Sequence, residues 1–483
     1  MSKNWFRIGL VSIFLLSLAV RFWGLDRFNT LVFDEVYYAK FGNNYLTHVP
    51  FFDGHPPLGK LIIALGIWLG SHVKFLYENV NGLTGSLRSP WDYRWINAFL
   101  GSFIPLLNAG IAYQLSSRRS FALIAGLFTA VDGIFIVESR YALINIYIVI
   151  FGLLGHWLFL LALNHQKQQR KLFLIIAGIA FGCSIATKWN GLFFLAGVYC
   201  LWLFAWIWQI IGKKINHNSE EIHQQTESPL QKLTQIYAWQ IILFLGVIPL
   251  IVYSLIWIPH LQLDTKYGFI EVHKQILSFH ERLGGNNANV HPYCAAWYKW
   301  PLLIRPMAYY YKTAYSIHEP LPVLGPDLPA NAGKIIYDVH AMGNPFLWWF
   351  SVAAMLFLIG MLIVSMVMFL QQKKQFTLPK NFTVDTWIAL YLVVNYATNL
   401  VPWMRVSRCA FIYHYMTAVV FAFLAIAWFV DQCLRSYYYP LQAIGVSLSV
   451  IILVAFVFWL PIYLGLPLKI ELYRLRMWFN SWI

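Results

Sequence analysis

Residues 241–258 read IILFLGVIPLIVYSLIWI, a run without a charged side chain. About 20 apolar residues cross the hydrocarbon core of a bilayer as an α-helix, and the runs at 8–20 and 441–462 approach or reach that length. Of the 483 residues, 59% are hydrophobic and 11% are charged, whereas soluble domains carry about 25% charged residues. The composition excludes a soluble globular protein and predicts an all-α polytopic membrane protein.

The apolar pattern predicts about eleven transmembrane helices. They are expected at 8–24, 94–115, 121–137, 141–163, 172–187, 190–211, 237–258, 345–370, 385–401, 409–430 and 441–464. Basic pairs in the short connections, such as Arg118–Arg119 and Lys373–Lys374, fall on the same side as Lys3. Because Lys and Arg concentrate in cytoplasmic loops, we expect the N-terminus inside and the C-terminus outside. The net charge of +15 is then a topology signal, not a sign of nucleic-acid binding.

The predicted spans divide the chain into three regions. Residues 1–258 form an N-terminal transmembrane module, 259–344 an external loop, and 345–483 a C-terminal transmembrane module. A further external segment, 25–93, lies inside the first module. It contains the apolar stretch 57–70, which is too short to span a bilayer. We therefore expect the external loops to carry short interfacial or re-entrant helices.

The cysteines carry little signal in the sequence. They are Cys183, Cys200, Cys294, Cys409 and Cys433, far apart and without a CxxC pair. Three of them lie within or at the ends of apolar segments. A disulfide framework is therefore not expected, and no convincing set of metal ligands is visible.

Acidic residues gather in the first external segment. The stretch VFDEVYYAK places Asp34 beside Glu35 just outside the first predicted span, and FFDGHPPLGK supplies Asp53, His55 and Lys60. An isolated acidic pair at the interface would simply be solvated. The second motif in the same segment favours a functional interpretation.

Basic residues return to the same side at the ends of predicted spans. They are Arg94, Lys188, Arg405 and Arg408. Singly, each cation could snorkel to the interface; jointly, they indicate an anionic ligand at the membrane surface. Such a site suits transfer from a lipid-phosphate-linked sugar, in which cations stabilise the departing phosphate and a carboxylate takes the proton of the incoming hydroxyl. A single base with direct displacement inverts the anomeric centre.

An ordered series of motifs over nearly the whole chain resembles the protein O-mannosyltransferases, membrane enzymes of the GT-C glycosyltransferase class. The series is FDEVYYAKF, FFDGHPPLGKL, YRWINAFLGSFIPLL, ESRYALIN, ATKWNGLF, HPYCAAWYKWPLLIRPMAYYY, GNPFLWW and PWMRVSRCAFIYHY. The resemblance implies a GT-C fold, a polyprenyl-phosphate mannose donor entering from the bilayer, and Ser or Thr hydroxyls of exported polypeptides as acceptors. The secretion machinery is a possible partner, and no further cofactor is implied.

The resemblance also implies roles for single residues. Asp34 would be the catalytic base, and Glu35 would support or orient the acceptor. Arg94 would contact the donor phosphate or order the acidic loop, and Lys188 would be a further phosphate contact. The expected substrate-binding set is Arg94, His55, Lys60, Lys188, Arg405 and Arg408.

Three departures from the family pattern matter, and the first and third favour a bacterial-type enzyme; we expect it in the inner membrane, with its site on the external side. Tyr37–Tyr38 replace the His-Phe of many eukaryotic members. Ile144–Asn145 replace a common Leu-Asp, so an acidic role is lost there. The segment 259–344 is too short for the β-trefoil domain of eukaryotic members.

Other functions remain open at this stage. Another GT-C enzyme could move a different lipid-linked sugar to a lipid such as lipid A. A transporter is a less favoured alternative, because transporter sites lie near the bilayer midplane. A catalytically silent subunit would not be expected to keep Asp34, Glu35 and Arg94.

Overall fold

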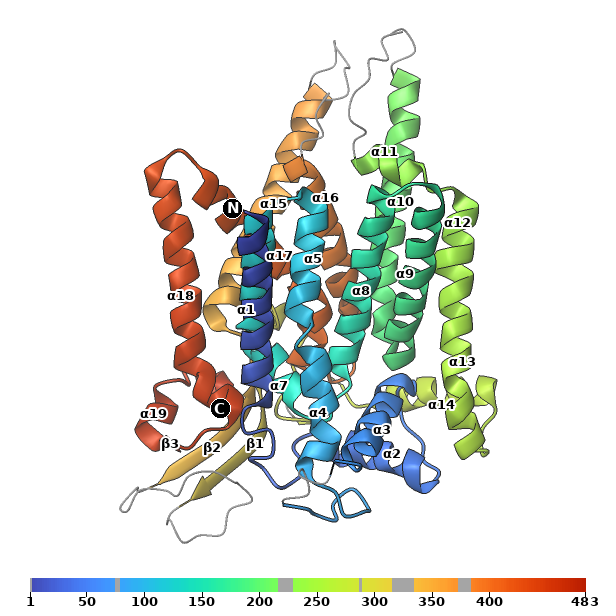
Figure 1. Cartoon of the computed structure of the whole chain (residues 1–483), viewed down its shortest axis with the longest axis vertical. Coiled ribbons are helices and arrows are strands. Elements are labelled where there is room, and N and C mark those ends of the chain that lie inside the picture. Colours follow the sequence, from blue (N-terminus) through green and yellow to red (C-terminus); the bar gives the residue numbers. More distant parts are fainter. Residues whose placement is uncertain (1, 74–78, 216–228, 286–288, 315–333, 372–383) are drawn as a thin grey trace.

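The computed structural model describes residues 2–73, 79–215, 229–285, 289–314, 334–371 and 384–483 (Figure 1). Within these ranges nine helices are long and apolar enough to cross a membrane, or ten if the bent pair α6–α7 is one span. The remaining expected span is α16 (Val384–Leu400), a helix of 17 residues. The polytopic helical architecture is confirmed.

The long helices run side by side in Figure 1. Their bounds are α1 (Lys3–Phe22), α4 (Pro90–Gly101) continued by α5 (Ile104–Ser116), α6 (Arg119–Ala130), α7 (Gly133–Arg140), α8 (Asn145–Asn164), α9 (Lys167–Thr187), α10 (Leu192–Ile215), α12 (Ala238–Ile242) continued through a π-helical turn by α13 (Ile248–Leu263), α15 (Pro345–Gln371), α17 (Met416–Arg435) and α18 (Tyr439–Leu464).

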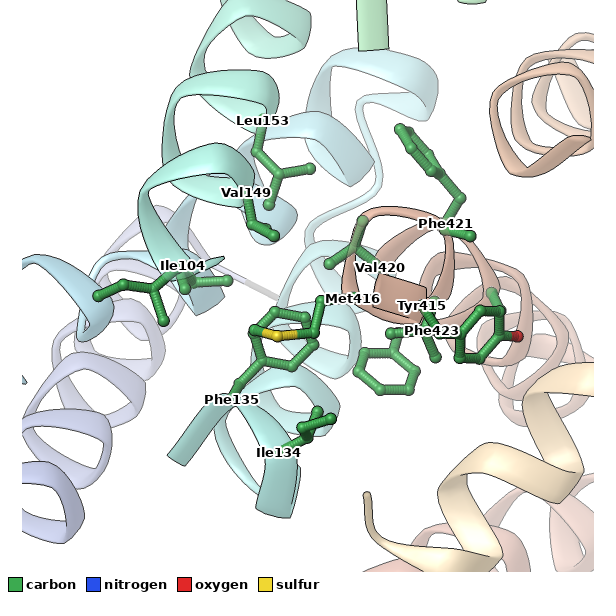
Figure 2. Packing of buried hydrophobic residues seen from close by; sticks show 14 of the residues in the cluster. Ile104, Ile134, Phe135, Val149, Leu153, Tyr415, Met416, Val420, Phe421 and Phe423 are labelled. Atoms are coloured by element: carbon green, nitrogen blue, oxygen red, sulfur yellow. The ribbon is translucent and has the colours of Figure 1, made fainter. Parts of the chain in front are cut away.

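Helix α17 lies at the centre of the bundle. In the most apolar stretch of this span 83% of the residues are buried, whereas in α1 the share is 17%. Helix α17 is therefore surrounded by protein, and most of the surface of α1 is left to lipid. Figure 2 shows side chains of α17 against those of α7 and α8. The rings of Phe423 and Phe135 meet edge to face, with centroids 6.1 Å apart. This aromatic and aliphatic packing fixes the position of α7.

The bend between α6 and α7 is 58° and has a polar cause. Asp132 occupies the break and accepts a hydrogen bond from the backbone N–H of Phe135, which caps α7. The same carboxylate accepts hydrogen bonds from the backbone of Asn344 and from the indole of Trp348, at 3.0 and 2.8 Å. The bend brings the end of α7 next to the start of α8 and to strand β1 (Met307–Ala314), where Glu138 contacts Asn145 and Tyr309.

Short elements gather at one end of the bundle, away from the N-terminus (Figure 1). They are the helices α2 (Glu35–Thr47), α3 (Leu58–Gly70), α14 (Phe269–Arg282) and α19 (Ile470–Arg474), and the strands β1 (Met307–Ala314), β2 (Ile335–Ala341) and β3 (Leu468–Lys469). At the opposite end lies α11 (Pro229–Thr234). The expected short apolar helix at 57–70 is therefore present as α3.

A small antiparallel sheet in the order β1-β2-β3 was not expected. It joins the segment between α13 and α15 to the C-terminal segment, because Ile335 and Ile336 of β2 pair with Lys469 and Leu468 of β3. The chain termini lie at opposite ends of the bundle in Figure 1, which agrees with the eleven spans expected from the sequence. Of the basic pairs used to orient the chain, Lys373–Lys374 lies outside the described residues.

Candidate active site

Asp34 directly precedes α2, and its side chain makes no capping hydrogen bond to the helix. The residue is half-buried. Phe33 before it has a φ of 53°, a left-handed value that bulky residues rarely adopt and that often marks functional sites. The ring of Phe33 stacks on Tyr309 with centroids 4.0 Å apart. This contact fixes the backbone that presents Asp34.

Glu35 is fully buried and anchors α2. Its carboxylate accepts hydrogen bonds from the backbone N–H groups of Val32 and Ala142, at 2.8 and 2.9 Å. The guanidinium of Arg94 donates to both oxygens, at 2.9 and 2.8 Å. Each oxygen therefore accepts two bonds. An acceptor contact, as expected from the resemblance, would require one of these bonds to break, so the geometry supports a structural role.

Arg94 orders the acidic loop. Helix α4 begins at Pro90 because Ser89 and Asp92 form a capping box, which places Arg94 in its second turn. Besides the two bonds to Glu35, Arg94 donates to the backbone carbonyls of Leu25, Phe28 and Thr30, at 3.1, 2.9 and 2.7 Å. These bonds use all five N–H groups of a guanidinium. Of the two expected roles, the geometry supports the ordering of the loop and not the phosphate contact.

Lys60 is also used within the protein. Its ammonium pairs with the carboxylate of Asp53 and donates to the backbone carbonyl of His55 at 2.7 Å. The His55 ring lies 5.3 Å from the ring of His280 in α14. Burial, together with the charge of nearby Lys188, lowers the pKa of His55 well below its usual value. A substrate contact by Lys60 is therefore not supported, whereas the lowered pKa favours the neutral form of the His55 imidazole.

Lys188 is the centre of a group of charges contributed by distant segments. It lies at the end of α9 and is 6% exposed. The charges of Arg408, Asp34, Glu138 and Asp53 all act on its ammonium. We call these five residues the charged cluster. They come from the segment between α1 and α4 (Asp34 and Asp53), the end of α7 (Glu138), the end of α9 (Lys188) and the connection after α16 (Arg408), so the fold brings together groups up to several hundred residues apart.

Direct contacts hold the ammonium of Lys188 in this cluster. It donates to the side-chain oxygen of Asn145 at 3.3 Å and lies 5.2 Å from the ring centroid of Tyr413. The amide nitrogen of Asn145 donates to both oxygens of Glu138, at 3.2 and 3.3 Å. The hydroxyl of Tyr309 donates to Glu138 Oε1 at 2.5 Å. Among the described residues Lys188 forms no direct ion pair, so its charge is positioned without being neutralised by contact.

Asp34 and Lys188, two members of the charged cluster, have shifted pKa values. Burial raises the pKa of Asp34 to about 7; the charge of Lys188 opposes this shift and that of Asp53 adds to it. Burial and the charge of Arg408 lower the pKa of Lys188 to about 8. A carboxylate with a pKa near neutrality is suited to general-base catalysis.

The two cations expected between residues 401 and 415, Arg405 and Arg408, differ in their surroundings. Arg408 belongs to the charged cluster and donates to the carbonyl of Cys409 at 3.0 Å. Arg405 is exposed and forms no hydrogen bond or ion pair with the cluster in the part of the chain that the structure describes. The expectation of no disulfide is wrong, because Cys409 is bonded to Cys294. Residues 115 apart in sequence give no spacing signal, and only the fold brings them together.

The sequence did not single out three residues of the site: Glu138, Tyr309 and Tyr413. Glu138 and Tyr413 lie in the motifs ESRYALIN and PWMRVSRCAFIYHY, so the signal was present without an assigned role. Tyr309 lies in MAYYY, where neighbouring tyrosines cannot be told apart by sequence alone. Within the described ranges no group of three or more His, Cys, Asp or Glu could hold a metal ion.

Comparison with known proteins assigns the whole chain. Residues 11–264 match the family described as dolichyl-phosphate-mannose-protein mannosyltransferase, and residues 265–482 match the C-terminal four-transmembrane region of protein O-mannosyltransferases. The chain belongs to this family.

Individual relatives agree with the family match. Polyprenol-phosphate-mannose–protein mannosyltransferase of Mycolicibacterium smegmatis is 24% identical over 94% of this chain and 88% of its own length. Protein O-mannosyl-transferase 1 of mouse is 28% identical over 59% of this chain, but the match spans only 37% of the mouse protein. The Saccharomyces cerevisiae Pmt1-Pmt2 complex bound to the sugar donor matches with a TM-score of 0.78 at 15% identity, covering 100% of this chain and 93% of that one. The fold is therefore the GT-C glycosyltransferase fold.

The two matched regions meet at the charged cluster. Asp34, Asp53, Glu138 and Lys188 belong to the first region, whereas Arg408 and the Glu138 partner Tyr309 belong to the second. Neither region alone contains the complete site.

Proposed function

We propose that this protein O-mannosyltransferase transfers mannose from a polyprenyl-phosphate mannose donor to Ser or Thr hydroxyls of exported polypeptides, with inversion of the anomeric centre. The observation that carries the proposal is the charged cluster, in which the charges of Asp34 and Arg408 both act on Lys188 and the side chain of Asp34 makes no capping hydrogen bond. The names of relatives that cover most of the chain, including one from Corynebacterium glutamicum, support mannose and a polyprenol carrier.

The reaction assigns one task to each charge. The carboxylate of Asp34 accepts the proton of the acceptor hydroxyl as that oxygen forms a bond to the anomeric carbon. The bond between this carbon and the phosphate oxygen breaks, and its electron pair leaves with the polyprenyl phosphate. Lys188 and Arg408 stabilise the charge that develops on the phosphate. Asp34 as the only base implies direct displacement and hence inversion.

We place the reaction on the external side of a bacterial inner membrane. The Cys294–Cys409 disulfide lies next to Arg408, and disulfides persist in oxidising compartments such as the periplasm. The basic connections Arg118–Arg119 and Lys167–Arg170–Lys171 support a cytoplasmic location for the other ends of the helices. An external site also suits acceptors that have already crossed the membrane.

The test is transfer by the purified protein in lipid nanodiscs. The substrates are labelled polyprenyl-phosphate mannose and a Ser/Thr peptide, with an Ala peptide as the matched control. Parallel reactions replace the donor by another polyprenyl-phosphate sugar or the peptide by a lipid acceptor. We expect mannose on the Ser/Thr peptide alone, in the anomeric configuration opposite to that in the donor. Transfer only to a lipid acceptor, or transfer of another sugar only, would contradict the proposal and favour a different GT-C reaction.

A further inference from the structure

We infer that Tyr309 is a positioning residue that acts on both halves of the site: its hydroxyl positions the phosphate-binding cation Lys188, and its ring positions the loop of the base Asp34. The inference rests on the proposed function and assigns a role to a residue of the external loop that the reaction itself does not touch. It follows from two separate sets of contacts, one for each end of the side chain.

The hydroxyl acts through two intermediate side chains. Tyr309 donates to Glu138 at 2.5 Å, both oxygens of Glu138 accept from the amide nitrogen of Asn145, and Asn145 accepts a hydrogen bond from Lys188 at 3.3 Å. The partners fix the orientation of the amide, because a carboxylate only accepts and an ammonium only donates. The chain Tyr309–Glu138–Asn145–Lys188 therefore has a single direction of donation at each link.

Asn145 explains why this arrangement leaves Lys188 available to an anion. An aspartate at this position would pair directly with the ammonium of Lys188 and would also face the carboxylate of Glu138, so two like charges would compete for one cation. The neutral amide of Asn145 links Glu138 to Lys188 by hydrogen bonds and does not neutralise the charge of Lys188. An ammonium has three N–H groups, and one hydrogen bond to Asn145 leaves the others for a phosphate.

The ring of Tyr309 acts on the other half of the site. It stacks on Phe33 with an interplanar angle of 13°, and Phe33 carries the left-handed φ that precedes Asp34. A strained backbone conformation persists only where its surroundings determine it. The aromatic ring, and not the hydroxyl, supplies this contact, so the two actions of Tyr309 can be separated by substitution.

The strand itself is irregular at this residue. In the pairing of β1 with β2, Ala308 faces His340 and Tyr310 faces Val339, so Tyr309 is the extra residue of a β-bulge. Bulges redirect side chains and are common beside active sites. Here the bulge turns Tyr309 into the protein, where its side chain is 6% exposed. The sheet of the external loop is thereby connected to the site.

The experiment compares Tyr309→Phe with Tyr309→Leu. Removing the hydroxyl leaves Glu138 without one of its donors, which for a charged acceptor corresponds to a change of about 10-fold. Because Lys188 also stabilises the charge that develops on the departing phosphate, we expect Tyr309→Phe to raise the donor KM about 10-fold and to lower kcat by a smaller factor of about 2–3. We expect Tyr309→Leu to raise the donor KM similarly and also to lower kcat about 10-fold, because a misplaced catalytic group slows the chemical step.

The matched control is Tyr310→Phe. Tyr310 is the next residue of the same strand, and its buried hydroxyl has no hydrogen-bond partner among the described residues, so its removal should leave both constants unchanged. If Tyr309→Phe does not fold, Asn145→Ala interrupts the same path to Lys188 and should raise the donor KM in the same way. The Tyr309 inference is overturned if Tyr309→Phe or Asn145→Ala keeps the donor KM of the parent protein.

A binding measurement separates this inference from the proposed function. The affinity for a polyprenyl phosphate without sugar should fall about 10-fold in Tyr309→Phe and stay unchanged in Tyr310→Phe. A parent protein that transfers no mannose would contradict the proposed function alone. Equal affinities of the parent and Tyr309→Phe for the polyprenyl phosphate would overturn the role of the hydroxyl alone.

Discussion

Replacement of Arg94 by lysine tests how the acidic loop is held. The substitution keeps the positive charge next to Glu35 but removes the planar fork that reaches two carboxylate oxygens and three carbonyls. If Arg94 were a phosphate contact, lysine would be a tolerable replacement, because lysine also binds phosphate as a point charge. If Arg94 orders the loop, lysine cannot replace it.

The structure sets the size of the effect. Lysine has three N–H donors on one nitrogen, so at least two of the five acceptors now bonded to Arg94 lose their donor. Each buried acceptor left without a partner costs about 1–3 kcal/mol, which gives a loss of about 2–6 kcal/mol. Folded proteins are stable by about 5–15 kcal/mol, so we expect Arg94→Lys to insert and fold with a clearly lower unfolding temperature. Because Asp34 adjoins Glu35, we also expect turnover to fall about 100-fold through misplacement of the base.

The assay measures thermal unfolding, kcat and the donor KM of the purified variant. Arg88→Lys is the control, since Arg88 lies in the same external segment, is half-buried, and makes one side-chain bond to Asn43 at 3.2 Å. We expect little change in that variant. An unfolding temperature and kcat equal to those of the parent, with a raised donor KM, would refute the structural role of Arg94 and restore the phosphate contact.

Three further predictions concern the charged cluster and its surroundings. The pH profile of kcat/KM should be bell-shaped, rising as Asp34 loses its proton at about pH 7 and falling as Lys188 loses its proton at about pH 8. Asp34→Asn should lower the rate about 10²–10⁴-fold and should remove the rise on the acidic side of the profile. A parent profile that is flat from pH 6 to 8 would contradict these assignments. Arg408→Gln should raise the donor KM and move the alkaline limb to higher pH, because the charge of Arg408 lowers the pKa of Lys188, whereas exposed Arg405→Gln should change neither; equal effects of the two variants would count against the cluster. Cys409→Ser should lower the stability of the protein by about 2–5 kcal/mol, measured by thermal unfolding, and an unchanged unfolding temperature would show that the disulfide contributes nothing.

The site was predictable where one local motif carries one function. Asp34 and Lys188 were expected from short motifs and lie together in the structure. Arg94 was also identified, but its role was open, because a cation at a helix end can bind a ligand or a carbonyl. The choice depends on which acceptors surround it, and those acceptors belong to residues 25–35.

The sequence by itself determined the membrane architecture, since apolar length and the absence of charge set where a helix can cross a bilayer. It also determined that α3 is too short to span and that acidic and basic motifs share one side of the bundle. Only the tertiary structure decided the pairing of Arg94 with Glu35, the Cys294–Cys409 disulfide and the contact of Tyr309 with Glu138. These contacts join segments 59 to 171 residues apart. No local pattern specifies them, because they depend on helix packing that brings distant segments to one end of the bundle.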